Sequence, residues 1–557
     1  MAGLRVLADR GWAVPSEQGR PGCRRNKDKA HAGDDIARER PPTFRWPPRN
    51  GQQSGTRGGT VLFPVPEDDR WEMPELGLRP TGGRAWVAAL LIGVSLPAEP
   101  ADWDITPRLT AAETYTDNVG LAGDEADEEE EWITQLNPGL TLARRGGRAE
   151  VDLEYRMQNL YYARESNRNN TYHQLAAHGN AELMKEAFFV EADAGYSQQI
   201  IAPEERVSLR NIDVTQNRTD VGTARISPYA VKRFGDFATS TIRYTYDQVY
   251  VERGPVSDTQ SHSYLAQIES GRRFNRLGWA LSYRRRDEGR RARGDTVQTE
   301  SVTARTSWQA TAKLNLFLSG GYERDEFRQR AGADEPEGSF WNAGFSWAPT
   351  PRTNVTASRG ERFFGTTWNL TASLRTRSTR WSARYNEDVR TVQQLLLDQE
   401  VFQLTDPFGE PVIGRDGQPV FVEVIIPRLS DEVFVERRGS LSVSKDTGKS
   451  TFALRLAESE REFQEGTETD RTSEVFASWR WRFATRTYSV LSGRWRRHEV
   501  ERTQTESDLQ DTSLAIVRRI RRSLTGSVEF THTEQDIQNG TDGYDQNTVT
   551  ARINMRF

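Results

Sequence analysis

Apolar and polar side chains alternate along the last thirteen residues of the chain, Asp545 to Phe557. One face of this stretch holds Val549, Ala551, Ile553, Met555 and Phe557. The other face holds Thr548, Thr550, Arg552, Asn554 and Arg556. A period of two is that of a β-strand, here with one apolar and one cationic face. In a soluble sheet the apolar face would meet a core, whereas in a membrane barrel it would meet lipid and the cationic face a wet lumen.

The same pattern recurs upstream. In the stretch 475–483 the apolar face carries Val475, Ala477, Trp479, Trp481 and Phe483, and Arg480 and Arg482 lie on the other face. Aromatic residues gather near the ends of such stretches, as with Tyr244 and Tyr246, Trp341 and Trp347, and Tyr488. Amphipathic rings at a lipid headgroup boundary would explain this distribution, and the general preference of aromatics for strands is the alternative.

The gaps between these strand-like stretches alternate in length. The short gaps are 144–148, 184–187, 233–236, 274–277, 310–313, 349–352, 376–380, 445–450, 484–486 and 521–523. Longer polar gaps lie between them, such as 117–131, 163–170 and 324–338. Short turns on one side and long loops on the other are typical of transmembrane barrels. Ten short and eleven long gaps predict an all-β fold over residues 102–557. We expect one antiparallel up-and-down barrel of about 22 strands, with a range of roughly 18 to 24, short periplasmic turns and long outer loops.

Composition agrees with this architecture and excludes others. Hydrophobic residues make up 35% of the chain, and the mean hydropathy is -0.75. These values exclude a helical membrane protein but suit a wide barrel, whose strands each turn one face to water. The 15 Trp, 16 Tyr and 23 Phe argue against a disordered chain. The net charge of -5 comes from mixed acids and bases, so we expect no nucleic-acid partner.

The N-terminal part differs from the rest. Residues 1–72 are rich in Arg, Pro and Gly without periodicity, and contain the single cysteine, Cys23. They are either a disordered extension or lie upstream of a true start at Met73. Residues 73–101 contain two arginines, a twelve-residue apolar run from Ala85 to Leu96, and a small-residue end. This form predicts a secretory signal peptide.

Two long gaps stand out. The acidic run Glu128 to Glu131 is either a solvated loop or a place for divalent ions. Residues 391–431 contain apolar runs separated by the turn signals DPFGEP and GRDGQP. We therefore expect this segment to have structure of its own, as a constriction in the lumen, a cap above the barrel mouth or an extracellular hairpin.

The sequence contains no catalytic signature, phosphate loop, dinucleotide fingerprint or zinc motif. Six histidines are scattered along the chain, and only His262, His498 and His532 come near expected outer strand ends. We therefore predict a protein that is not an enzyme and has no cofactor and no metal site.

The alternation of side chains along each strand predicts which charged residues face the lumen. The side chains predicted to point inward are Arg243, Arg284, Arg480, Arg482, Glu529, Arg552 and Arg556. A charge on the lipid face costs roughly 2 to 4 kcal/mol near the midplane, so these groups must meet water or one another. An arginine-rich wall would favour anions and acidic or polyhydroxylated glycans. A network of paired Arg and Glu that holds the barrel's shape is the alternative, and both can coexist.

Two resemblances refine these expectations. The terminal stretch, with Phe557 in phase with four other apolar residues, resembles the C-terminal signal strand of bacterial outer-membrane barrels. That resemblance implies that the barrel-insertion machinery reads it and that the barrel sits in outer-membrane lipid. Residues 105–119, ITPRLTAAETYTDNV, with the turn Tyr115 to Val119, resemble the first strand of the PEP-CTERM system-associated outer-membrane β-barrel proteins, a porin-like group. The second resemblance spans about 103–557 on a short motif and implies a bacterium that makes exopolysaccharide, but it carries over no site residues.

These observations support two functional hypotheses. The first is an outer-membrane channel that passes glycans or small anionic and polar solutes, in connection with exopolysaccharide export and its export proteins. The second is a structural or adhesive surface barrel that does not conduct because paired charges plug its lumen.

Overall fold

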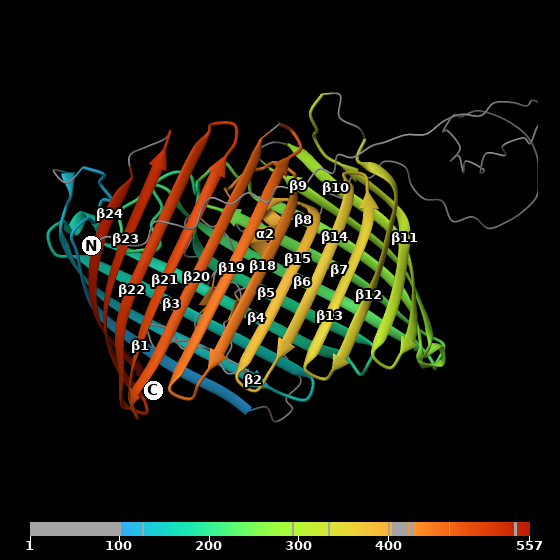
Figure 1. Ribbon diagram of the computed structural model, residues 1–557, viewed down its shortest axis with the longest axis horizontal. Coiled ribbons are helices and arrows are strands. Elements are labelled where there is room, and N and C mark those ends of the chain that lie inside the picture. Colours follow the sequence, from blue (N-terminus) through green and yellow to red (C-terminus); the bar gives the residue numbers. More distant parts are fainter. Residues whose placement is uncertain are drawn as a thin grey trace, which may run out of the picture. The chain divides into compact units, whose positions relative to one another are not determined.

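The computed structural model describes residues 102–557 except 125–126, 292–293, 332–334, 399–401, 404–420, 423–427, 467 and 540–542. The expected extension 1–72 and signal peptide 73–101 lie outside the described residues. Figure 1 shows a barrel whose strands run side by side around one lumen. No helix among the described residues is long and apolar enough to cross a membrane.

Twenty-two strands form one closed antiparallel sheet in which each strand pairs with its neighbours in the chain and β1 pairs with β24. This confirms the predicted fold class and strand number. The first half comprises β1 (Asp102–Thr116), β2 (Glu131–Arg145), β3 (Ala149–Tyr162), β4 (Asn170–Met184), β5 (Phe188–Ile200), β6 (Arg218–Phe234), β7 (Ala238–Val251), β8 (Thr259–Ser270), β9 (Leu277–Arg290), β10 (Asp295–Thr311) and β11 (Leu314–Glu326). The second half comprises β12 (Glu337–Thr350), β13 (Thr353–Arg362), β14 (Gly365–Arg375), β15 (Thr379–Arg390), β18 (Phe434–Asp446), β19 (Ser450–Phe463), β20 (Thr469–Ala484), β21 (Thr487–Val500), β22 (Thr505–Arg521), β23 (Leu524–Gln538) and β24 (Tyr544–Arg556).

Five small elements lie in the described parts of the connections. They are the 3-10 turns η2 (Ser166–Arg168) and η3 (Arg272–Phe274), the helix α2 (Val392–Leu397), and the paired strands β16 (Phe402–Gln403) and β17 (Phe421–Val422).

All ten predicted short gaps coincide with turns at the periplasmic end of the barrel. The turn between β18 and β19 places Gly448 at φ +87, a conformation that favours glycine. The opposite connections are less uniform than predicted. Only Phe363 and Phe364 join β13 to β14, and β11 continues to Glu326 where a loop was expected from residue 324. The observed loops are shorter than predicted because the β-strands continue past the lipid-facing part of the barrel wall. Polar residues beyond that level are still hydrogen-bonded within the sheet.

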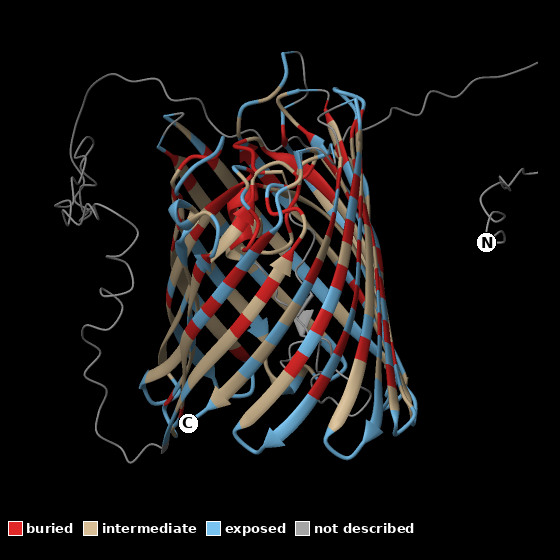
Figure 2. Cartoon of the chain, turned by 90° about the vertical axis from the view of Figure 1, so that its left-hand side faces the viewer, coloured by how far each residue is buried: buried red, intermediate tan, exposed pale blue. Residues whose placement is uncertain are grey.

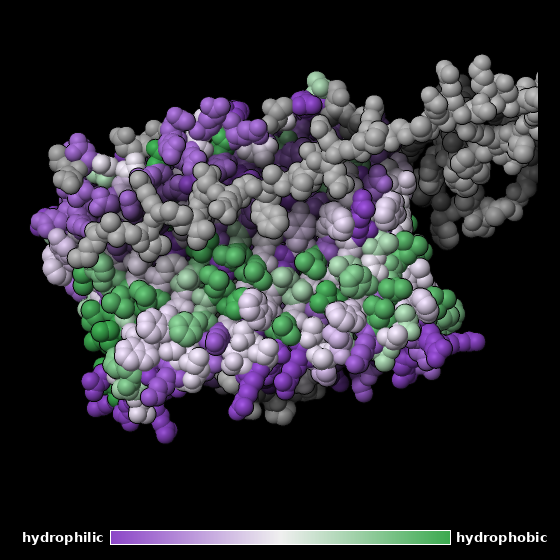
Figure 3. Space-filling model, in the orientation of Figure 1, coloured by the Kyte–Doolittle hydropathy of each residue, from purple (hydrophilic) through white to green (hydrophobic). Residues whose placement is uncertain are grey.

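The outer surface of the barrel carries the apolar belt. Ile242 is 63% exposed, Val528 56% and Leu318 52%, and all three belong to the outward phase of their strands. Figure 3 shows hydrophobic side chains forming a band across the barrel between polar zones. Trp341 and Trp347 are exposed on this surface as predicted. Tyr488 does not follow that prediction, since strand phase places it on the lumen side, with the Arg480 guanidinium 5.9 Å from its ring centre.

The terminal strand has its two predicted faces. Val549 and Ile553 are 44% and 45% exposed on the outward side, Ala551 and Met555 share their phase, and Phe557 is 72% exposed at the end. On the inward side Thr548 is buried.

The barrel closes between β1 and β24, and the predicted turn after Tyr115 lies at this seam. The Asn118 side chain is buried and donates to the backbone oxygens of Ala122 and Asp545, at 2.8 and 2.9 Å. Asp117 accepts hydrogen bonds from the Asn547 backbone and side-chain amide, at 2.7 and 2.8 Å. This short motif therefore joins the first and last strands at the outer rim.

Two connections fold into the barrel instead of standing above it. One is the loop 201–217 between β5 and β6, and the other consists of α2 with residues 428–433. Figure 2 shows buried segments inside the upper part of the lumen, while buried and exposed residues alternate along the surrounding strands. The described ends of the 391–431 segment thus lie in the lumen, and residues 404–420 and 423–427 lie outside the described residues.

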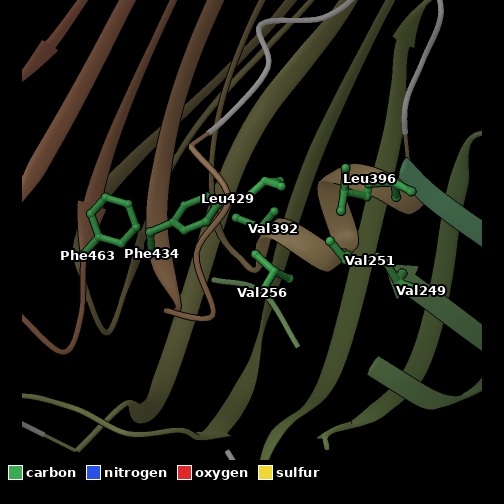
Figure 4. Close-up of a cluster of buried hydrophobic side chains, with 9 residues drawn as sticks. Val249, Val251, Val256, Val392, Leu396, Leu429, Phe434 and Phe463 are labelled. Atoms are coloured by element: carbon green, nitrogen blue, oxygen red, sulfur yellow. The ribbon is translucent and has the colours of Figure 1, made fainter. Parts of the chain in front are cut away.

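A hydrophobic cluster anchors α2 to the wall. Val392 and Leu396 of the helix pack with Leu429 against inward-facing residues of four strands and one loop. The wall residues are Val221, Val249, Val251, Val256, Phe434 and Phe463. Figure 4 shows Leu429 and Val392 between the Phe434 ring and the β7 valines. Apolar side chains on the lumen side of a barrel need such a partner, because that face otherwise meets water.

Candidate functional site

The inner wall of the barrel is divided into two unlike halves. On β19 and β22 nearly every inward side chain is buried, including Thr451, Arg455, Ser459 and Ser513. On β9 to β14 many inward positions, such as Ser282, Ser301, Ser319 and Asn342, are only partly buried, whereas Glu288, Arg290, Glu323 and Asp325 near the outer end are buried. The lumen is therefore filled along one wall and accessible along the other.

A cavity of about 670 Å³ lies against the accessible wall. Hydroxyl and amide side chains from six strands line it: Thr245, Ser263, Ser301, Thr303, Ser319, Asn342 and Ser358. Arg243 and Arg284 lie among them, and Gln394 of α2 and Asp398 border the cavity from inside the lumen.

The predicted lumen residues differ in their surroundings. Arg243 forms an ion pair with Glu191, and its guanidinium lies 4.0 Å from the centre of the Tyr229 ring. Arg552 lies 3.7 Å from Glu529. Arg480 donates to the Thr451 hydroxyl at 3.3 Å. Arg284 is exposed to the cavity, and within the described part of the chain it has no ion-pair or hydrogen-bond partner.

Arg482 and Arg556 share the inward phase of their strands but lie at the periplasmic end, away from the cavity. The seven predicted residues thus do not form one cluster, because strand phase determines the face of a residue but not its height along the barrel.

Ion pairs border the cavity. Arg362 lies 2.7 Å from both Glu323 and Asp388. The buried carboxylate of Asp247 lies 2.6 Å from Arg225 and 2.8 Å from Arg286. Arg225 also reaches Asp398 at the end of α2, at 3.3 Å. Networks of this kind hold neighbouring strands in register and neutralise charge that the lumen would otherwise have to solvate.

Arg210 connects the loop 201–217 to the opposite wall. Its guanidinium donates to Asp511 and Thr533, both at 3.0 Å, and to Thr548 at 2.9 Å. These partners come from β22, β23 and β24, respectively. Further bonds join the Val207 backbone to Gln535 and Tyr544. The loop therefore spans the lumen and covers the inner side of the barrel seam.

Asp431 holds in place the second connection that folds into the lumen, α2 with residues 428–433. This segment and the loop 201–217 are called the two insertions below. Its carboxylate accepts hydrogen bonds from the Ser257 backbone and from Gln393, both at 2.9 Å. Its backbone oxygen accepts one from Arg290. At the start of α2, Thr391 caps the helix by accepting from the Gln394 backbone, and donates to Glu288 at 3.2 Å. Buried polar groups with partners on several elements fix α2 in one position.

The two insertions contact each other through a backbone hydrogen bond and an ion pair. The Leu429 amide donates to the Ile201 carbonyl at 3.0 Å. Arg428 lies 2.7 Å from Glu468 and 3.7 Å from Glu204. Burial raises the pKa of the Glu204 carboxyl above its ordinary value, and the nearby Arg428 only partly opposes this. Burial likewise raises the pKa of Asp213 in the same loop.

The acidic run Glu128 to Glu131 joins two rim loops. Glu129 pairs with Arg168 and Glu130 with Arg164, each at 2.7 Å. The buried Glu131 carboxylate accepts from the backbone amides of Trp132, Arg164 and Glu165. The hydrogen bond from Arg164 lowers the pKa of Glu130. The Glu129 and Glu130 side chains stay half exposed, so the run is a solvated loop that ion pairs join to its neighbour. The described residues contain no group of His, Cys, Asp and Glu that could hold a metal.

The three outer histidines are far apart in the barrel. His262 and His532 lie in the outward phase and contact Tyr244 and Asn547 at 2.8 and 2.9 Å. His498 is buried on the lumen side beside Thr472 at 2.9 Å. His498 Nε2 also lies 3.8 Å from the Glu204 carboxylate in the loop 201–217. Within the described part of the chain, His262 and His532 have no hydrogen bond to a serine hydroxyl or a carboxylate.

Sequence reasoning missed the loop 201–217 and Arg210. The available signal was the apolar content of this loop, since Val207, Leu209 and Ile212 would be exposed if the loop stood in solvent. Such residues in a barrel loop indicate that the loop packs against something.

No family model and no curated protein matches the sequence. Solved structures that align with the barrel include the FrpB iron transporter from Neisseria meningitidis, with 10% identity over 81% of both chains and a TM-score of 0.44. They also include the siderophore receptor PirA from Pseudomonas aeruginosa, with 9% identity over 81% of this chain and 80% of that chain and a TM-score of 0.40. A loop-deletion form of OmpT, an outer membrane protein of Vibrio cholerae, aligns with 6% identity over 82% of this chain and 100% of that chain, at a TM-score of 0.30.

Similarity this distant says nothing of what the present barrel binds or carries. The closed ladder with an outward apolar belt, short turns at one end and a polar lumen is the architecture of the bacterial outer membrane, and this protein belongs there.

Proposed function

We propose that this barrel is an outer-membrane channel for small anionic and polar solutes, whose path follows the accessible wall of β9 to β14. The observation that carries the proposal is Arg284, an unpaired guanidinium exposed in a cavity of hydroxyl and amide groups. A guanidinium without a carboxylate partner can donate charge-assisted hydrogen bonds to a passing anion. Hydroxyl and amide groups replace part of the water that a polar solute loses, without binding it tightly.

Anion selectivity in planar bilayers tests this proposal. Wild-type protein should form channels whose reversal potential in a salt gradient indicates a preference for anions. Arg284→Gln should reduce that preference, because it removes the unpaired positive charge from the path. The matched control is Arg285→Gln, whose side chain lies in the outward phase and pairs with Asp287. Equal selectivity in wild type and Arg284→Gln would contradict the proposal.

A second candidate function is a structural or adhesive surface barrel that does not conduct. The insertions favour it, since the loop 201–217 and the α2 segment are joined by buried hydrogen bonds and ion pairs across the lumen. A barrel of this size commonly has a plugged lumen. Bilayers that stay silent with folded wild-type protein, together with liposomes impermeable to small sugars, would support this candidate over the channel.

We further propose that the solutes are acidic glycans and that the channel acts with exopolysaccharide and its export proteins, as in PEP-CTERM systems. The support is the Tyr115 to Val119 motif of the first strand and the combination of arginine with hydroxyl groups in the lumen. Liposome swelling that is faster with a uronic-acid disaccharide than with a neutral one of equal size would favour this solute class. Equal swelling rates with the two disaccharides would contradict this solute class and indicate a general channel with no preference for acidic glycans.

The terminal strand supports one more proposal, that the insertion machinery recognises Val549, Ala551, Ile553, Met555 and Phe557. Phe557→Ala should lower the yield of folded barrel in cells while leaving refolding from urea into detergent unchanged. A fall in both would indicate a role in stability instead.

A further inference from the structure

A second cavity, of about 410 Å³, lies on the outward side of the barrel near the outer ends of β8, β9 and β10. It does not belong to the lumen, because its lining residues Gln260, His262 and Asp287 alternate with the inward residues Ser261 and Glu288. Arg291, Asp295 and Thr296 also line it, together with Gly289, Gly294 and the buried Arg290.

Below this cavity the same strands are apolar or aromatic on their outward face. Ile242, Tyr264 and Leu281 are 63%, 45% and 48% exposed there. Tyr244 and Tyr264 lie 5.5 Å apart, and Tyr246 lies 5.4 Å from the His262 ring. The wall therefore changes from aliphatic through aromatic to polar toward the outer end, which is how a barrel meets the headgroup level of the outer leaflet.

Two groups in this cavity are available to an anion. The Nδ1 atom of His262 is engaged by the Tyr244 hydroxyl at 2.8 Å. When the tyrosine donates, the ring hydrogen is on Nε2, which has no partner among the described residues. The Arg291 side chain likewise has no described ion-pair partner. The carboxylates in the lining are already compensated, since Asp287 pairs with Arg285 at 3.0 Å and Asp295 lies 3.9 Å from Arg328.

The tyrosine and histidine pair recurs on another hairpin. The Tyr155 hydroxyl lies 2.8 Å from His173 Nδ1, and 18 residues separate the two, as they separate Tyr244 and His262. Both tyrosines come seven residues before the outer end of their strands, Tyr162 and Val251, and both histidines three residues after the start of theirs, Asn170 and Thr259. The repeated position indicates that this pair belongs to one level of the barrel wall and not to one local loop.

We infer that this outward cavity binds the phosphorylated sugar headgroup of an outer-leaflet glycolipid. The acyl chains lie along Ile242 and Leu281, the phosphate accepts hydrogen bonds from Arg291 and His262 Nε2, and the sugar hydroxyls meet Gln260. Charge complementarity and the apolar face directly below select an amphiphile with an anionic head over a soluble anion.

Native mass spectrometry of the full chain in detergent, titrated with diphosphoryl lipid A, tests the inference. Wild type should retain bound lipid A. His262→Ala and Arg291→Ala should each weaken binding about tenfold, as expected for the loss of one hydrogen bond to a charged group. Tyr244→Phe should weaken it less, because the ring stays in place. His178→Ala, a histidine paired with Asp193 on the lumen side, should bind as wild type.

The heat-dependent gel shift of each variant reports whether its barrel is folded. Unchanged lipid A binding by folded His262→Ala and Arg291→Ala would overturn the inference. Equal binding of dephosphorylated lipid A would overturn it as well, since the phosphate would then have no role. Full competition by millimolar inorganic phosphate would identify a simple anion site in place of a lipid site. Loss of channel activity has no bearing on these results, so the inference stands or falls independently of the proposed transport.

Discussion

Asp117 and Asn547 are 430 positions apart in the chain, yet the Asp117 carboxylate accepts hydrogen bonds from both the backbone and the side-chain amide of Asn547. The pair joins the rims of β1 and β24, which are the first and last strands of the described barrel and pair without being consecutive in the chain. Closure of the barrel therefore has a specific polar contact at its outer end as well as the backbone ladder.

We predict that Asp117→Ala loosens this seam. The variant loses two hydrogen bonds to a charged group, and the barrel should be destabilised by about 2 kcal/mol. The urea concentration at half-unfolding in detergent, followed by tryptophan fluorescence, measures the change. Asp104→Ala, in β1 at its exposed periplasmic end, where the described side-chain partner is Thr106, should have little effect. A similar loss of stability in both variants would contradict a special role for the seam contact.

We predict that Arg210→Ala releases the loop 201–217 from the wall. Breaking a mostly buried ion pair removes the Arg210 counter-charge from beside Asp511, which costs roughly 3 kcal/mol, enough to populate the undocked loop. Hydrogen exchange of the Val207 and Val214 amides, which are bonded in the docked loop, should then accelerate. Arg164→Ala removes an exposed pair in a neighbouring loop and should leave these amides protected. Unchanged protection in Arg210→Ala would show that apolar contacts alone hold the loop.

We predict that docking of the loop 201–217 depends on pH. Burial raises the pKa of Glu204 and of Asp213 in the docked loop, so the docked state holds these protons more tightly than the undocked state. The stabilisation from this difference is complete below the ordinary carboxyl pKa of about 4 and is lost as pH rises through the raised values. Docking should therefore be tightest in acid and weaken toward neutral pH.

Single-channel conductance at a series of pH values measures this pH dependence of docking. Hydrogen exchange of the Val207 and Val214 amides, corrected for the pH dependence of intrinsic exchange, measures it as well. Glu204→Gln and Asp213→Asn mimic the protonated forms and should flatten it. A pH profile that both variants leave unchanged would assign the effect to other groups.

We predict opposite outcomes for arginine at two adjacent positions of β11. Leu318 faces lipid and Ser319 lines the lumen cavity. Leu318→Arg should destabilise the barrel by about 2 to 4 kcal/mol, because the charge lies in the apolar belt, whereas Ser319→Arg meets water and should be tolerated. Unfolding in urea measures both, and equal destabilisation would mean that the two faces are assigned wrongly.

Much of the fold could be predicted because the relevant signals are local. The period-two alternation in residues such as Val549 to Phe557 and Trp479 to Phe483 determines which face of each strand meets lipid. The ten short gaps determine where consecutive strands turn, and a meander of consecutive strands has one simple closure. Tyr488 shows the limit of this reasoning, since an aromatic near a turn lies on the lumen side once strand phase is taken into account.

The candidate site was less predictable. Strand phase points to Arg243 and Arg284 as lumen residues, but it does not indicate that Glu191 pairs with the first while the second stays unpaired. That difference depends on which residues the register brings opposite each other from strands far apart in sequence. The same holds for Arg210, whose partners on three strands lie more than 300 positions away.

The sequence by itself determined the barrel, its strand number and its two faces, because alternation and gap length are properties of neighbouring residues. Only the tertiary structure decided that the loop 201–217 and α2 fold into the lumen, and which wall they leave accessible. The physical reason is that a loop can bury Val207, Ile212 or Val392 only where the closed barrel offers a complementary surface, and that surface exists only after distant strands have come together.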